Sequence, residues 1–134
     1  MKGKAAFVSD FDGTITGDDF FAYASEAFFD EKSLTPWRRF KKGEITHFEA
    51  LKEMFEKIRV SCGEFNAFMD KIPVDGGFAE GARICREKNM PVYICSAGCD
   101  YYINYLIGNI IEKYGVTLVA NRGSYSSETG LVMQ

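Results

Sequence analysis

Three short apolar runs, separated by stretches of helical spacing, constrain the fold of this chain more than any other feature. The runs cover residues 4–9, 92–95 and 116–120, and each is followed by a polar residue. Buried strands that alternate with helices pair in parallel through right-handed crossovers, so we expect an α/β fold with a parallel sheet. Ligands bind beyond the carboxyl ends of such strands. The residues that follow the first two runs are therefore the candidates for function.

Helical spacing fills the long stretch between the first two runs. Apolar residues recur at intervals of three and four over residues 18–72, and Ser61 with Glu64 indicates a capping box at the start of the last helix there. Residues 1–16 and 73–134 are therefore predicted to form a Rossmann-like α/β core. Residues 17–72 are predicted to form a helical cap inserted into that core.

The second half of the chain carries further helix and turn signals. We expect helices at 78–88 and 100–114, the latter ending at Gly115 as its C-cap. The tail, residues 124–133, contains two short runs around a turn and is expected to form a β-hairpin.

Composition narrows the class of protein. The formal charge of −3 and the pI near 5.2 argue against nucleic acid as a partner, because such binding needs a concentrated basic surface. No apolar run is long enough to span a bilayer, and the one near the N-terminus is shorter than a signal-peptide core. The four cysteines lack C-x-x-C spacing, and Cys85 and Cys95 are expected to be small buried hydrophobes. We therefore expect a cytoplasmic protein.

Asp10 and Asp12 are the first candidate site residues. Two carboxylates spaced i, i+2 after a strand point the same way, and Mg²⁺ is the natural ion to bring them together. Asp10 could then attack phosphorus, while Asp12 serves as general acid and base. Gly13 permits a sharp turn that exposes amides to phosphate oxygens, and the Thr14 hydroxyl can orient nearby groups. The alternative for an Asp-x-Asp-Gly segment is an ordinary turn.

Ser96, Ala97 and Gly98 follow the second run in the same way. A hydroxyl and a small-residue turn at the start of a helix suit an anion, because free amides there favour phosphate. The simpler alternative is an N-cap with a tight turn. The position at the end of a strand favours a phosphate site.

The segments 10–16 and 94–98 together resemble the first and second motifs of the haloacid dehalogenase (HAD) superfamily of phosphohydrolases. The resemblance implies that Asp10 is the nucleophile and a Mg²⁺ ligand, that Asp12 is the general acid and base, and that Ser96 holds the phosphoryl group. The insertion resembles the helical cap of the phosphoserine phosphatase branch and of related phosphatases of methionine salvage. It implies a HAD-like fold and a Mg²⁺-dependent phosphatase of a small phosphorylated metabolite, acting through an aspartyl-phosphate.

Two family motifs have no counterpart after Ser96. The third is a lysine, for which Lys113 comes too early, and the fourth is an acidic cluster that completes the Mg²⁺ site. The core is therefore expected to be incomplete at its C-terminus, with weaker metal binding and the first strand left as an open edge. We expect that edge to be covered by a homodimer or by a second polypeptide, unless the chain is a truncated product.

Two other functions remain open. The first is a non-catalytic binding or interaction protein that keeps the fold. The second is a receiver-like signalling domain, which is disfavoured because its acceptor aspartate would follow a later strand. Within the insertion, Asp18 and Asp19 are expected to cap a helix, and His47 is expected to lie on an ordinary surface. Segment 37–42 is expected to be a solvated helix face, and the insertion's phenylalanines are expected to serve as packing.

Overall fold

A three-stranded parallel sheet forms the base of the structure, a computed structural model that describes residues 4–134. Its strands are β1 (Phe7–Ser9), β2 (Val92–Cys99) and β3 (Thr117–Asn121), in the order β1-β2-β3. The three predicted strands and their parallel pairing are confirmed, although β1 is shorter and β2 longer than expected. The pairing register between β2 and β3 shifts between Cys95 and Cys99, and β2 stays extended across this shift.

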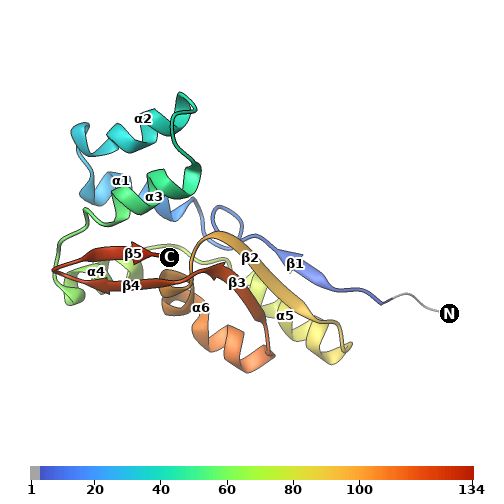
Figure 1. The fold of residues 1–134 in the computed structure, drawn as a ribbon. Helices are drawn as coiled ribbons and strands as arrows, with labels where there is room; N and C mark the ends of the chain where they lie inside the picture. Colours follow the sequence, from blue (N-terminus) through green and yellow to red (C-terminus); the bar gives the residue numbers. More distant parts are fainter. Residues whose placement is uncertain (1–3) are drawn as a thin grey trace.

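Two helices lie on one side of this sheet, α5 (Gly77–Glu87) and α6 (Asp100–Tyr114) (Figure 1). Each lies within a connection between two parallel strands, and both bury apolar residues in the hydrophobic core. Helix α6 ends at Gly115, whose φ of 62° is left-handed, so the predicted C-cap is confirmed.

The helices of the insertion gather beyond the carboxyl end of β1 (Figure 1). They are α1 (Phe20–Phe28), a 3₁₀ turn η1 (Lys32–Leu34), α2 (Thr35–Lys41) and α3 (His47–Phe55). Thr46 and Glu49 form a complete capping box at the start of α3, a signal that the sequence analysis overlooked. We refer to α1, α2 and α3 as the cap helices.

The chain enters and leaves the insertion at one place. Thr16 forms an antiparallel bridge with Val74, and the Gly17 amide donates to the Pro73 carbonyl at 3.1 Å. The insertion's last helix, α4 (Cys62–Asp70), packs against α1, where the Phe28 and Phe68 ring centroids lie 4.7 Å apart, and lies beside the C-terminal hairpin (Figure 1). The boundary of the cap at residue 72 stays a prediction.

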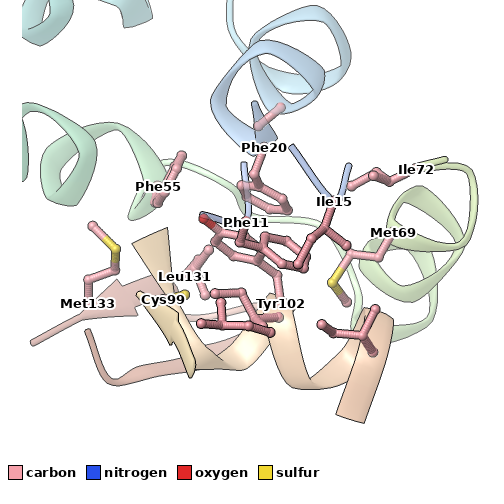
Figure 2. Packing of buried hydrophobic residues seen from close by; sticks show 14 of the residues in the cluster. Phe11, Ile15, Phe20, Phe55, Met69, Ile72, Cys99, Tyr102, Leu131 and Met133 are labelled. Atoms are coloured by element: carbon pink, nitrogen blue, oxygen red, sulfur yellow. The ribbon is translucent and has the colours of Figure 1, made fainter. Parts of the chain in front are cut away.

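The C-terminal hairpin consists of β4 (Gly123–Ser126) and β5 (Gly130–Met133), and it confirms the hairpin expected from the sequence. Leu131 and Met133 are fully buried and join the shared hydrophobic core beneath the cap (Figure 2). Gly130 has a φ of 72°, and a side chain there would collide with the Glu56 carbonyl at the end of α3. This glycine therefore allows the hairpin to pack closely against the cap.

Strand β1 is an edge strand within the described part of the chain, as the sequence predicted. Val8 is 62% exposed, and Val119 on β3 is 54% exposed. The sheet thus keeps apolar side chains in solvent on the side opposite α5 and α6. Association through this edge stays a prediction.

The cysteines correct one expectation. Cys95 is exposed, because its position in β2 points away from the helices, and Cys99 is the buried thiol instead. Cys85 is half-buried. Over residues 4–134, no helix combines the length and the apolar character that crossing a membrane requires.

Candidate active site

Asp10 and Asp12 line one cavity of about 150 Å³ between the end of the sheet and the cap helices. Asp10 directly follows β1 and is exposed. Its Oδ1 accepts a hydrogen bond from the Phe11 amide at 2.8 Å, and the Thr14 hydroxyl donates to its Oδ2 at 3.4 Å. These contacts orient the Asp10 carboxylate while leaving it open to the cavity.

The loop after Asp10 is tightly wound. The amides of residues 14, 15 and 16 all donate to the Phe11 carbonyl, and the Gly13 amide donates to the Thr16 hydroxyl at 3.1 Å. Gly13 has a φ of 74°, which favours glycine at this position. Gly13 and Thr14 line a neighbouring open groove rather than the cavity itself. Their contact with phosphate stays a prediction.

Asp12 is tied to three different elements. Its Oδ1 accepts the Phe20 amide at 2.8 Å, and its Oδ2 accepts the Tyr102 hydroxyl at 2.8 Å and the Ser96 hydroxyl at 3.3 Å. Asp12 therefore caps α1, whereas Asp19, the residue expected to do so, makes no side-chain cap. The second acid of the motif holds the cap helices to the sheet.

The environment of Asp12 favours its protonated form. Burial raises the pKa of its carboxyl group, and the nearby charge of Asp19 acts in the same direction, against hydrogen bonds that lower it. Burial also raises the pKa of Tyr102 well above its ordinary value, with a further contribution from Asp12. Tyr102 is therefore a neutral hydrogen-bond donor at physiological pH.

Ser96, Ala97 and Gly98 line the cavity, but not as a turn at a helix start. They continue β2, and α6 begins at Asp100, because the strand stays extended past its register shift. The Gly98 amide donates to the Ser96 hydroxyl at 3.0 Å. The predicted small-residue turn is therefore wrong, although the structure does bring these residues beside Asp12.

The role of Tyr102 was not predicted from the sequence. Its ring stacks on Phe20 with centroids 4.0 Å apart and planes 7° from parallel (Figure 2), and its hydroxyl donates to Asp12. A Cβ at Gly98 would collide with that hydroxyl oxygen. The sequence carries no local signal for this contact, because Gly98 lies in β2 and Tyr102 in α6, and a tyrosine among apolar helix residues looks like ordinary packing.

The cap side of the cavity is mostly apolar. It is lined by side chains from all three cap helices, which are Phe21, Trp37, His47, Leu51 and Phe55. His47 was expected on an ordinary surface and Trp37 on a solvated helix face. Both expectations are wrong, because the two rings pack 5.9 Å apart and face the cavity. Phe21 also does more than pack, since it forms part of this wall.

The oxygen donors suit a hard cation. Carboxylate oxygens of Asp10 and Asp12 share the cavity, and Mg²⁺ accepts such ligands while keeping several waters. Within residues 4–134, no group of three His, Cys, Asp or Glu side chains could hold a metal ion by itself. The described residues therefore fit a Mg²⁺ ion that is only partly ligated by protein side chains.

Sequence comparison finds curated relatives of this chain that share one name. The chain is 25% identical over 121 residues to a Bacillus cereus protein named 2-hydroxy-3-keto-5-methylthiopentenyl-1-phosphate phosphatase. A Bacillus anthracis protein of the same name matches to the same extent. Each alignment covers 89% of this chain and 54% of the relative, so the chain spans about half the length of these relatives. No protein-family model matches the chain.

Solved structures share the fold over nearly the whole chain. A phosphoserine phosphatase with an analogue of its phospho-aspartyl intermediate superposes with a TM-score of 0.66 at 19% identity, covering 96% of this chain and 61% of that one. A HAD family hydrolase from Salmonella enterica serovar Typhi gives a TM-score of 0.70 at 14% identity, covering 96% and 44%. A phosphoserine phosphatase from T. onnurineus gives 0.67 at 20% identity, covering 98% and 64%.

Proposed function

We propose that the chain, which shares the fold of haloacid dehalogenase hydrolases, belongs to that superfamily and hydrolyses phosphate monoesters of small metabolites, with Asp10 as the nucleophile. The observation that supports this most is the contrast between two acids in one cavity. Asp10 is exposed, whereas Asp12 is desolvated, hydrogen-bonded and shifted toward its protonated form. Two carboxyl groups in such different environments suit one nucleophile and one acid.

The first step is attack on phosphorus. An Asp10 carboxylate oxygen forms a bond to phosphorus, the bond to the ester oxygen breaks, and Asp12 gives its proton to that departing oxygen. Asp12 is suited to this because burial raises its pKa, and Tyr102 and Ser96 fix the orientation of the group. The products are an alcohol and an aspartyl-phosphate.

The second step regenerates the site. Asp12, now a carboxylate, takes a proton from water as the water oxygen attacks phosphorus. The bond from phosphorus to Asp10 then breaks, which releases inorganic phosphate and returns both side chains to their starting states. The Tyr102 hydroxyl stabilises the Asp12 carboxylate between the two steps, because hydrogen bonds favour the charged form.

Mg²⁺ would be held by oxygens of Asp10 and Asp12 and, when bound, would offset the charge between these carboxylates and the phosphoryl oxygens. The relatives' names describe phosphatases of a methylthiopentenyl phosphate and of phosphoserine. They support a small phosphorylated metabolite as the substrate class.

The test is hydrolysis of 4-nitrophenyl phosphate by the 134-residue chain, with Mg²⁺ and with EDTA. We expect turnover that needs Mg²⁺ and is abolished in Asp10→Asn. Asp18→Asn is the matched control, because Asp18 is exposed and lies outside the cavity. Turnover that survives in Asp10→Asn would exclude Asp10 as the nucleophile.

The alternative is a binding protein that keeps the site without turnover. One observation favours it: among the described residues that line the cavity, none is lysine or arginine, so no side-chain cation offsets the charge of a bound phosphoryl group. A folded chain that binds phosphate esters but releases no phosphate, with or without Mg²⁺, would support this function over the phosphatase.

A further inference from the structure

We infer that the cap side of the cavity selects an uncharged, largely apolar leaving group, and disfavours leaving groups that carry a carboxylate. The inference rests on the proposed function, because it specifies the substrate class of the same site. It comes from the opposite character of the two ends of the cavity.

One end is acidic and polar, and the other is apolar. Asp10, Asp12 and Ser96 lie at the sheet end, where a phosphoryl group meets the nucleophile. Leu51 and Phe55, both buried in α3, lie at the cap end. An ester that places its phosphoryl group on Asp10 therefore points its leaving group into the apolar end.

The aromatic wall of the cap end is fixed by packing between helices. Phe21 of α1 stacks on Trp37 of α2 at 4.5 Å, and both Trp37 and Phe40 contact His47, at 5.9 and 5.2 Å. Because rings from three helices hold one another, this wall exists before a ligand arrives. Such preorganised aromatic surfaces bind apolar groups at little cost in conformational entropy.

The cations of α2 do not line the cavity, although Lys41 lies over the Trp37 ring at 5.2 Å. Arg38 donates to the Glu31 carbonyl at 2.7 Å, and Arg39 pairs with Glu44 at 3.4 Å. Among the described lining residues, none is lysine or arginine. A carboxylate on the leaving group would therefore lose water without gaining a cationic partner, and it would share the cavity with three aspartates.

A cationic leaving group is also poorly matched to the apolar end. Asp19 is the lining acid contributed by the insertion, and its Oδ1 lies 3.0 Å from the position that a Cβ would take on Gly13. It therefore belongs to the acidic end, beside the loop after β1. The cap end is left with apolar and aromatic walls, which suit an apolar leaving group.

The test uses Trp37, which is the single tryptophan of the chain and lies in the cavity wall. Its fluorescence in the Asp10→Asn variant is titrated with phenyl phosphate, O-phosphoserine, phosphocholine and inorganic phosphate in the presence of Mg²⁺, because that variant is expected to bind esters without hydrolysing them. We expect phenyl phosphate to bind at least about tenfold more tightly than either charged ester. Equal or tighter binding of O-phosphoserine or phosphocholine would overturn the inference.

Variants locate the selectivity. Phe21→Ala is expected to weaken the binding of phenyl phosphate about tenfold and to leave the binding of inorganic phosphate unchanged, since inorganic phosphate has no leaving group. Phe21→Leu keeps an apolar side chain and serves if the alanine variant does not fold. Tyr105→Phe is the control, because Tyr105 is an exposed aromatic outside the cavity. Equal losses for both ligands in a folded Phe21 variant would contradict the inference.

Inorganic phosphate separates this inference from the proposed function. If it binds and aryl phosphate is hydrolysed, but O-phosphoserine is preferred, the substrate class is wrong and the phosphatase stands. If neither inorganic phosphate nor any ester binds the folded chain, the phosphatase and the leaving-group site both fail. If esters bind with the expected preference and are not hydrolysed, the selectivity stands and the phosphatase fails.

Discussion

The Tyr102 hydroxyl donates a 2.8 Å hydrogen bond to Oδ2 of Asp12, across a separation of 90 residues. This bond joins the first turn of α6 to the loop after β1, directly beneath the cap helices. Because Asp12 also accepts the first amide of α1, one carboxyl group connects the sheet, the helix after β2 and the cap. Changes at this contact should affect both protonation and positioning.

Tyr102→Phe removes the hydroxyl and should slow the hydrolysis of esters whose leaving group needs protonation more than that of esters whose leaving group does not. We expect kcat/KM for phenyl phosphate to fall by about tenfold or more, and that for 4-nitrophenyl phosphate by less than about threefold. The reason is that nitrophenolate departs without full protonation, so a misplaced Asp12 matters less. Parallel kinetics on both esters, with Tyr105→Phe as control, check this, and equal losses on both esters would assign Tyr102 a purely structural role.

Gly98→Ala should disrupt the same contact by steric overlap. The added Cβ would occupy the position of the Tyr102 hydroxyl and come within 3.0 Å of Asp12 Oδ2. We expect a loss of about 1–3 kcal/mol in the free energy of unfolding, measured with urea. Gly108→Ala in α6 is the matched control and should stabilise the chain by about 0.5–1 kcal/mol, since its Cβ would make only ordinary contacts. A neutral Gly98→Ala would show that Tyr102 can move away at no cost.

Asp12→Asn should stabilise the chain at neutral pH in EDTA. Burial raises the pKa of Asp12 in the folded state, so the folded chain binds this proton more tightly than the unfolded chain does. The free energy of unfolding therefore falls as the pH rises above the pKa of the unfolded group. The variant's advantage should therefore be full above the raised pKa, shrink as the pH falls through it, and vanish below the ordinary value of 3.8. We expect Tm to rise by roughly 2–5 °C at pH 7.

Thermal scans from pH 3 to 8 check the Asp12 prediction, with Glu53→Gln as the control. Glu53 is an exposed acid on α3, so its removal should change Tm little at any pH. A destabilised Asp12→Asn at pH 7 would mean that the three hydrogen bonds outweigh the cost of burying the charge.

The sequence predicted the sheet, the hairpin and the position of Asp10 because those depend on local patterns. Apolar runs mark strands, and a glycine at 115 marks the end of α6. The capping of α1 by Asp12 could not be predicted, since it depends on where the cap folds back onto the loop. His47 was misassigned for the same reason, because its partners come from α2 and the single histidine forms no local pattern.

The cysteines should differ sharply in reactivity. Burial raises the pKa of the Cys99 thiol to about 12, so almost no thiolate is present at pH 8, whereas Cys62 and Cys95 are exposed. Iodoacetamide should label Cys62 and Cys95 in the native chain and reach Cys99 only after denaturation. Peptide mass spectrometry over time checks this, and early labelling of Cys99 would show that the contact between α6 and the hairpin opens readily.

The open edge of β1 should mediate self-association, and we propose a second copy of this chain as the partner. Val8 is 62% exposed on a strand whose outer side has no partner among residues 4–134, and two identical edges can pair in a symmetric antiparallel arrangement. We expect light scattering to show a concentration-dependent dimer that Val8→Lys weakens by about tenfold or more, because a charged edge strand resists pairing. Lys71→Ala, an exposed change at the far end of α4, is the control. A monomer at all concentrations whose β1 amides exchange rapidly with deuterium would contradict the prediction, and a complex formed only with a different polypeptide would replace the proposed partner.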